Sequence, residues 1–347
     1  MEHVYQYLVF LAEAVTVVIA VLVVLSAIVS LSVRRHSSET GHLEVRKLND
    51  RLQGLRHSVE EVLLDPASFK KARKQEAKSN KQEAKATSKA RKTQSDESQK
   101  RRVFVIDFEG DLQASKIDHL RTEITALLTL AQATDEVVVR IESPGGVVHG
   151  YGLAASQLSR IKEHGIPLVV TVDKVAASGG YLMASVADRV LAAPFALIGS
   201  IGVIAQIPNV HRLLKKHDVD VEVLTAGRYK RTLTLLGENT EEGRQKFVEE
   251  LEDIHALFQE FVLANRPALD MDRVATGEAW YGQRAIDLQL VDEISTSDEY
   301  LSKACEDSDV FEVRWVETQK PLERLMARIE TGINNTLQRL LNWRGGL

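Results

Sequence analysis

The sequence predicts an α/β domain with a mainly parallel sheet, preceded by one transmembrane helix and a helical or disordered linker. Two observations lead to this prediction. From residue 102 onward, short β-branched runs alternate with longer segments of helical periodicity, which is the pattern of parallel strands with helices on their faces. Ahead of that region, an apolar run is followed by a basic, polar stretch.

The apolar run covers residues 14–33 and contains twenty residues without a charge. A helix that rises about 1.5 Å per residue crosses about 30 Å of hydrocarbon over this length. We expect the helix to begin near Leu8 and residues 1–35 to form an uncleaved anchor, because no Lys or Arg precedes the run as in a signal peptide. Basic side chains follow the run closely, which favours a cytoplasmic catalytic region. They are Arg34, Arg35, Arg46, Lys47 and Arg51.

Residues 36–66 are expected to form a short amphipathic helix. Its apolar residues alternate spacings of three and four, as in the seam of a coiled coil. An amphipathic helix that packs on its own chain would show the same spacing. The residues are Val45, Leu48, Leu52, Leu55, Val59 and Val62.

Residues 67–101 should form a basic flexible linker or a solvated helix. Between Lys70 and Arg102 there are thirteen Lys or Arg and four Asp or Glu, with almost no aliphatic side chain. Such a segment buries too little apolar area to offset the entropy of ordering. Anionic lipid headgroups are a more plausible partner than nucleic acid, because no aromatic side chains are interleaved with the charges.

The region 102–305 carries the alternating pattern. We expect helices over 117–130, 152–162 and 241–264, and we expect the apolar stripe of the last one to lie in the core. That stripe is Phe247, Leu251, Ile254, Phe258 and Phe261. The predicted strands are Val103–Phe108, Val137–Glu142, Leu168–Val172, Arg189–Ala192 and Val219–Leu224.

The C-terminal region, residues 306–347, should add a strand and an amphipathic helix over residues 321–343. This helix could pack on a partner subunit or lie on the membrane. Cys305 is the one cysteine of the chain, so no intrachain disulfide can form.

Three glycine-containing turns follow predicted strands, at the edge where open α/β sheets bind their ligands. Paired glycines let the backbone approach a ligand and direct N–H groups at it, as an oxyanion hole requires. A serine at the mouth of a helix has the surroundings of a nucleophile, but it could equally be an ordinary N-cap, and the other two turns could be purely architectural. The turns are Ser143-Pro144-Gly145-Gly146, Ala176-Ala177-Ser178-Gly179-Gly180 and Gly199-Ser200-Ile201-Gly202.

A nucleophilic serine needs a general base. Lys230 follows the predicted strand 219–224, which would place it at the same edge of the sheet as Ser178. A lysine acts as a base only when its pKa falls below the usual value of about 10.4, and Arg228 and Arg231 are possible contributors. Taken alone, Lys230 could be a surface lysine. The histidines have no recognisable catalytic context: His149, His164, His211, His217 and His255.

In this order and at these intervals, the three turns and Gly227-Arg228-Tyr229-Lys230 resemble the signal peptide peptidase A family of Ser-Lys serine peptidases. The resemblance covers residues 102–294 and implies a Clp protease/crotonase-like fold. It also implies that Ser178 is the nucleophile, that Lys230 is the base, and that Ser200 orients the lysine. The N–H groups of Gly179, Gly145 and Gly146 would form the oxyanion hole, and no metal or organic cofactor would take part.

The whole chain, with its anchor, basic linker and C-terminal helix, resembles the inner-membrane proteases of this family. The resemblance implies hydrolysis of unfolded, hydrophobic or signal peptides, in ring-like homo-oligomers whose sites can combine residues of neighbouring subunits. Membrane lipid would be contacted through residues 8–33. The alternatives are a crotonase-type acyl-CoA enzyme and a non-catalytic membrane scaffold. The first would leave Lys230 unexplained, and the presence of both Ser178 and Lys230 argues against the second.

Overall fold

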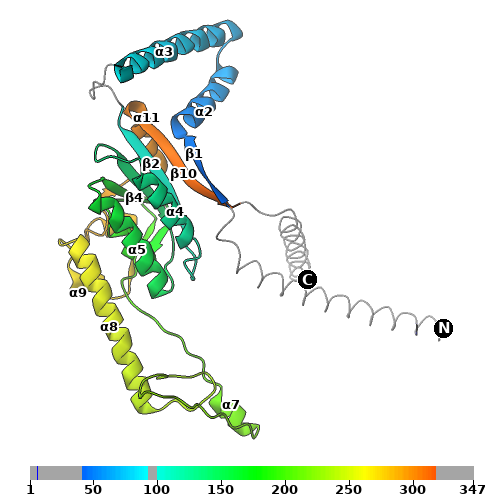
Figure 1. Ribbon diagram of the computed structural model, residues 1–347, viewed down its shortest axis with the longest axis vertical. Coiled ribbons are helices and arrows are strands. Elements are labelled where there is room, and N and C mark those ends of the chain that lie inside the picture. Colours follow the sequence, from blue (N-terminus) through cyan, green and yellow to red (C-terminus); the bar gives the residue numbers. More distant parts are fainter. Residues whose placement is uncertain (1–5, 7–40, 93–99, 318–347) are drawn as a thin grey trace. The chain divides into compact units, whose positions relative to one another are not determined.

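A computed structural model describes residue 6 and residues 41–92 and 100–317 (Figure 1). The membrane-spanning helix expected over residues 8–33 and the amphipathic helix expected over residues 321–343 lie outside these residues. Within the described ranges, no helix is both long and apolar enough to cross a membrane. Residues 45–314 form one compact unit, and residues 6, 41–44 and 315–317 are the described part of a second.

The main sheet has seven strands in the order β1-β10-β2-β3-β4-β6-β9. Every pairing from β10 to β9 is parallel, as the alternation of strands and helices predicts. Four of the five predicted strands are confirmed as β2, β3, β4 and β6. The strands are β1 (Gly41–Lys47), β10 (Asp309–Glu317), β2 (Arg102–Glu109), β3 (Glu136–Glu142), β4 (Leu168–Val172), β6 (Arg189–Ala192) and β9 (Glu293–Ile294).

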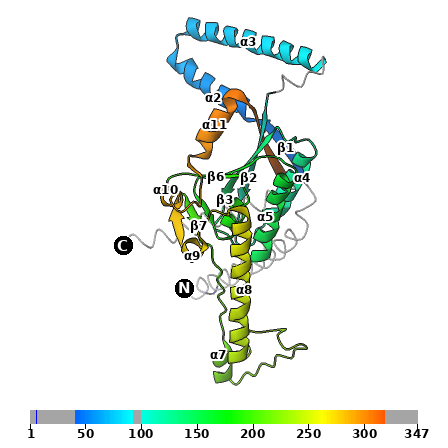
Figure 2. The ribbon, with the colours of Figure 1, turned by 90° about the vertical axis from the view of Figure 1, so that its left-hand side faces the viewer.

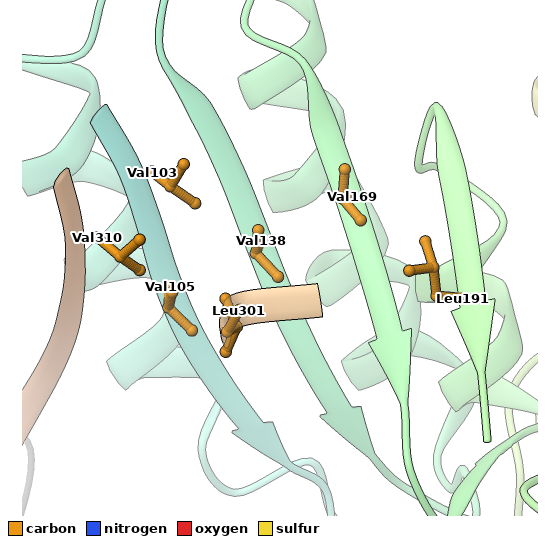
Figure 3. Packing of buried hydrophobic residues seen from close by; sticks show 7 residues of the cluster. All are labelled: Val103, Val105, Val138, Val169, Leu191, Leu301 and Val310. Atoms are coloured by element: carbon orange, nitrogen blue, oxygen red, sulfur yellow. The ribbon is translucent and has the colours of Figure 1, made fainter. Parts of the chain in front are cut away.

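Helices cover both faces of this sheet. On one face, α11 (Ser297–Asp307) places Leu301 among aliphatic side chains of five strands (Figure 3). On the other face lie α4 (Ile117–Leu128) and α5 (Val148–Glu163), which bury one side each, and α6 (Gly179–Ala184), which is buried almost throughout. Burial of each large aliphatic side chain contributes about 1.5–3 kcal/mol. The residues around Leu301 are Val103, Val105, Val138, Val169, Leu191 and Val310.

A second sheet of three strands supports the site described below. It consists of β5 (Val175–Ala177), β7 (Leu197–Gly199) and β8 (Ala279–Tyr281), in that order. The β5–β7 pairing is parallel and the β7–β8 pairing is antiparallel. A single β-bridge between Ser143 and Ala176 joins the end of β3 to β5. Two short helices, α9 (Met271–Val274) and α10 (Gly282–Ala285), flank β8 in the sequence.

Residues 48–92 form a helical hairpin of α2 (Leu48–Leu63) and α3 (Pro66–Lys92). Of the two expectations for the basic segment, the solvated helix is observed through Lys92. The expected coiled-coil seam is divided between two elements, because Val45 lies in β1 and Leu48 packs against the core cluster. Leu55, Val59 and Val62 of α2 are exposed.

The predicted strand over residues 219–224 is wrong. These residues have no regular secondary structure, and Leu224 is 88% exposed. A strand is stabilised by backbone pairing and by burial of one face, and neither is available to this segment within the described residues. The segment belongs to an arm, residues 202–265, that includes α7 (His211–Lys216) and α8 (Glu241–Asn265).

The long helix of the arm is present, but the expectation that its apolar stripe lies in the core is wrong. α8 begins at the N-cap Thr240, whose hydroxyl accepts a hydrogen bond from the Gly243 N–H at 3.1 Å. Val262, in its last turn, is the one buried residue of the helix. In two views, α7 lies beside the N-terminal end of α8 and away from the main sheet (Figure 1; Figure 2).

A polar junction holds the C-terminal end of α8 on the sheet. The Arg266 guanidinium donates two hydrogen bonds to the Asp292 carboxylate, at 3.0 and 2.8 Å, and a third to the Gln289 carbonyl at 2.7 Å. The same carboxylate accepts the N–H of Val190 in β6 at 2.7 Å. Bidentate pairing of this kind fixes orientation as well as distance. The junction therefore sets the direction in which α8 leaves the sheet.

We predict that Asp292→Asn lowers the free energy of unfolding by about 2 kcal/mol at neutral pH, the size of a lost charge-assisted hydrogen bond. Burial opposes ionisation of Asp292, but the hydrogen bonds from Arg266 and Val190 outweigh it, so the pKa of this carboxyl lies below its usual value. A lowered pKa adds stability only while the group is ionised. The contribution is therefore complete above about pH 4 and is lost as the pH falls through the pKa of the folded protein.

Denaturant unfolding of both proteins at a series of pH values measures this effect. The difference between wild type and variant should shrink below about pH 4. Asp287→Asn is the matched control, because Asp287 is exposed and lies five residues earlier. A difference that stays constant with pH would refute the role given to the ionised carboxylate.

Candidate active site

Backbone hydrogen bonds bring the three glycine-containing turns to one place. The Ser143 N–H donates to the Val175 carbonyl at 2.8 Å, and the Ala177 N–H donates to the Ser143 carbonyl at 3.0 Å. In the parallel β5–β7 pair, Ala177 lies opposite Gly199. The first and second turns are therefore joined by the β-bridge, and the second and third by strand pairing.

Ser178 stands at the centre of this arrangement. It is half-buried, and its backbone has φ 51° and ψ −119°, a conformation that non-glycine residues rarely adopt. Its N–H donates to the Gly199 carbonyl at 2.7 Å, and α6 begins at the next residue. Such backbone strain persists only where neighbours impose it, and it concentrates at functional sites.

Gly145 packs directly against Ser178. Its φ is 87°, in the region that favours glycine, and a Cβ atom there would lie 2.7 Å from the Gly179 nitrogen and 2.8 Å from the Ser178 Cβ. The close approach leaves no room for a side chain between the first turn and the serine. The backbone of the first turn therefore faces the position where a substrate carbonyl would meet Ser178.

The N–H groups near Ser178 are not equivalent. The Gly145 N–H is already engaged, because it donates to the Ser143 hydroxyl at 3.1 Å. The Gly179 N–H lies in the first turn of α6, where helix geometry supplies no acceptor. No described residue accepts a hydrogen bond from the Gly146 N–H either. The geometry thus offers Gly179 and Gly146 as donors, and gives Gly145 the different role of shaping the turn.

Tyr151 supports the first turn, and the sequence analysis missed it. Its ring is fully buried in α5, and its hydroxyl donates to the Asp111 carbonyl at 2.8 Å and lies 2.6 Å from the Ser143 hydroxyl. Burial raises the pKa of Tyr151, so the phenol remains protonated. The available signal was weak: a tyrosine on the apolar face of a helix requires a buried partner for its hydroxyl, but the spacing does not identify that partner.

Ser200 lies beside Ser178. Because Ala177 and Gly199 are paired in parallel strands, the residues that follow them are neighbours at the end of the small sheet. Ser200 also has a positive φ, 53°, and its N–H donates to the Glu278 carbonyl at 2.7 Å. Its side chain is half-buried. The position is compatible with a hydroxyl that contacts a group approaching Ser178.

Lys230 is not brought to Ser178 within the chain. It is exposed, in a turn closed by its own N–H on the Gly227 carbonyl at 3.2 Å. Its neighbours attach this turn to the start of α8: Arg228 pairs with Glu242 at 2.8 Å. In addition, the Lys246 ammonium lies 5.5 Å from the Tyr229 ring centroid.

The other end of α8 is the one near Ser178. There, α8 contacts α6, and the Tyr181 hydroxyl, three residues after Ser178, donates to the Leu290 carbonyl of the junction at 3.0 Å. From Lys246 to Val262 the helix rises by about 24 Å. Ser178 and Lys230 thus lie near opposite ends of the arm's helix.

Charged side chains that border the site are paired with one another. Lys174 bonds Glu142 at 2.9 Å, and Lys116 bonds Glu109 at 2.9 Å. Among residues 41–92 and 100–317, no group of three or more His, Cys, Asp or Glu is placed to hold a metal ion.

Comparison with known proteins shows to which family the chain belongs. Residues 2–158 match the model "Peptidase family S49 N-terminal", and residues 160–311 match "Peptidase family S49". The chain belongs to peptidase family S49. This S49 protease is 51% identical over 336 residues to "Probable protease SohB" of Haemophilus influenzae (strain ATCC 51907 / DSM 11121 / KW20 / Rd), covering 96% of this chain and 95% of that one. The family expected from the motifs is thereby confirmed, and within it the chain is of the SohB type.

Two further similarities are found, one to a protein sequence and one to a solved structure. A protein of the same name from Buchnera aphidicola subsp. Schlechtendalia chinensis is 44% identical over 307 residues, covering 87% of this chain and 99% of that one. Among solved structures, "1510-N membrane-bound stomatin-specific protease" in complex with a substrate peptide is 14% identical, with a TM-score of 0.37. That similarity covers 66% of the S49 protease and 98% of the solved chain.

We predict that Gly145→Ala lowers the rate of peptide hydrolysis by about a hundredfold, the effect of a misplacement of about 1 Å in an active site. The added methyl group must displace Ser178 or the Gly145–Gly146 turn, because the Gly179 nitrogen, the Ala177 carbonyl oxygen and the Ser178 Cβ all lie within 3 Å of its position. Gly152→Ala is the matched control: Gly152 lies in α5, and a Cβ there meets nothing within 4 Å. Steady-state kinetics on a fluorogenic peptide, with circular dichroism to verify folding, makes the comparison. Equal rates for the two variants would disprove the packing argument.

Proposed function

We propose that this S49 protease is a serine endopeptidase in which Ser178 is the nucleophile and Lys230 is the general base. The observation that carries the proposal is the strained Ser178 backbone, held between Gly145 and Gly199 and followed by the Gly179 N–H. A serine held this way presents its hydroxyl beside donors that can stabilise an oxyanion. The order and spacing of the three turns and of Gly227-Arg228-Tyr229-Lys230, which resemble those of Ser-Lys peptidases, support the choice of Lys230.

The proposed reaction is acyl transfer. Neutral Lys230 takes the Ser178 proton as the serine oxygen attacks the peptide carbonyl, and the N–H groups of Gly179 and Gly146 stabilise the resulting oxyanion. The protonated lysine then gives its proton to the leaving amine. Water, activated by the same lysine, releases the acyl group and restores the Ser178 hydroxyl. Ser200 would orient the lysine by a hydrogen bond, and no metal or organic cofactor is required.

We further propose that Lys230 reaches Ser178 of a neighbouring subunit in a ring-like homo-oligomer. Its attachment at the far end of α8 and its exposure support this, because a solvated lysine is a poor base and burial favours the neutral amine. The arm also exposes large apolar side chains, which mark association surfaces. Among them are Ile204, Leu213, Leu224 and Leu257.

Complementation between inactive chains tests the dyad and its division between subunits. Ser178→Ala and Lys230→Ala should each abolish peptide hydrolysis. Co-expressed with different affinity tags and purified through both, the two variants should recover activity. With random equal mixing, about one quarter of the sites would combine an intact serine with an intact neighbouring lysine.

Lys216→Ala is the matched control, because Lys216 is another exposed lysine of the arm, and this variant should retain full activity. Two results would contradict the proposal. Activity in Ser178→Ala alone would eliminate the nucleophile, and mixed oligomers without any activity would place both residues of each site in one chain.

The natural substrates we propose are unfolded or hydrophobic peptides, including signal peptides, at a bacterial inner membrane. This proposal rests on the family and on the uncharged run of residues 14–33, which would hold the enzyme beside membrane-derived peptides. The basic residues after the run favour a single-pass anchor with the catalytic domain in the cytoplasm.

Deletion of residues 2–35 should move the protein from the membrane fraction to the soluble fraction at about 0.5 M salt, where surface charge is screened. Val24→Arg should weaken membrane retention as well, since a central arginine costs about 2.5–3.5 kcal/mol of insertion. Val24→Leu is the matched control and should leave the protein in the membrane. Persistence of the deleted chain in the washed membrane fraction would show that residues 14–33 are not the anchor.

A further inference from the structure

Helix α3 separates its charges onto opposite faces. It contains ten Lys or Arg and two Glu, a net charge of +8 over 27 residues. Phe69 and Glu76 are seven residues apart, so they share a face, and they are more buried than the residues between them. At 3.6 residues per turn, the lysines at positions 70, 71, 74, 78 and 81 are centred about 170° from Glu76. All five are exposed.

The face that carries Glu76 is held against α2. The Glu76 carboxylate accepts a hydrogen bond from the Gln53 amide at 2.5 Å and lies 2.6 Å from the His57 Nε2. Arg73 contacts the other nitrogen of the same imidazole. The hydrogen bond from Gln53 lowers the pKa of Glu76, so the carboxylate remains ionised. The acidic side chain is therefore used within the hairpin, and the lysines are directed away from it.

The start of α3 is also fixed. Asp65 accepts the N–H groups of Ala67 and Ser68, both at 3.0 Å, which caps the helix, and Pro66 occupies its first position. The exposed lysines thus form a straight stripe on a helix of defined direction. In the sequence, the same spacing continues with Lys85, Lys89 and Lys92.

We propose that the lysine stripe of α3 binds the surface of a membrane that contains anionic phospholipids. The stripe is linear and consists of point charges, which suits a continuous anionic surface better than a single bidentate phosphate site. Its described face carries no aromatic side chain that could stack on bases, which disfavours nucleic acid. Between positions 70 and 81, the apolar residues of the helix are alanines. The contact with the membrane surface is therefore electrostatic and does not require insertion of side chains into the hydrocarbon.

Energy transfer to labelled lipid tests the contact in the full chain. A donor dye is attached at Gln82→Cys, one turn beyond Lys78, in a Cys305→Ser background, and the acceptor is a headgroup-labelled lipid. Vesicles contain phosphatidylcholine alone or with about 30 mol% phosphatidylglycerol, which supplies the anionic surface. An anchored chain is present on both kinds of vesicle, so a difference between them reports α3 and not the anchor.

We expect strong transfer on the anionic vesicles at about 50 mM salt and its loss at about 500 mM, where the screening length falls below 5 Å. Each lysine near an anionic surface contributes about a fivefold factor in binding. Replacing the five described lysines by glutamine should therefore reduce transfer to the level of phosphatidylcholine vesicles. Replacement by arginine should preserve it, and both replacements keep good helix formers.

Three outcomes would overturn the inference. The first is equal energy transfer on the two kinds of vesicle, and the second is energy transfer unchanged by the glutamine substitutions. Either result would mean that the lysine stripe does not bind anionic headgroups. Tighter binding of duplex DNA than of anionic vesicles by the detergent-solubilised chain at about 150 mM salt would assign the stripe to nucleic acid.

Discussion

The parallel pairing of β5 with β7, bridged to the end of β3, is the constraint on which the site depends. Three segments that are distant in sequence meet there through main-chain hydrogen bonds, and Ser178 takes its unusual backbone conformation from them. Such close backbone contacts leave room for small residues only. This explains physically why the positions of closest contact, Gly145, Ala177 and Gly179, carry small residues.

Two parts of the chain differ in how they are held. The sheet and its covering helices have a continuous aliphatic core, whereas the arm has a single buried residue in its 25-residue helix. The polar junction of Arg266, Asp292, Gln289 and Val190 connects the arm to the sheet. Next to it, the Leu290 carbonyl accepts a hydrogen bond from Tyr181 of α6. The chain is a protease of family S49, and the turns around Ser178 belong to the part with the aliphatic core, whereas Lys230 belongs to the arm.

The elements that depend mainly on neighbouring residues in the sequence could be predicted from it. Four strands and three long helices follow from periodicity, and the turns from glycine placement. The strand over residues 219–224 failed because β-propensity without a pairing partner does not make a strand. The stripe on α8 has the spacing of a core helix, but periodicity does not tell whether an apolar face meets its own chain or another. Likewise, no spacing rule connects Tyr151 to Ser143, or shows that the Gly145 N–H is already engaged.

Because α8 is long, a small rotation at its attached end produces a large displacement at its other end. Its 25 residues extend about 37 Å, so a rotation of about 10° at Arg266 displaces the far end by about 6 Å. Catalysis tolerates far less, since a misplacement of about 1 Å can cost a hundredfold in rate. Attachment at the Arg266 end alone, however rigid, does not supply that accuracy. Any group at the other end of α8 that takes part in chemistry therefore needs a second point of support there.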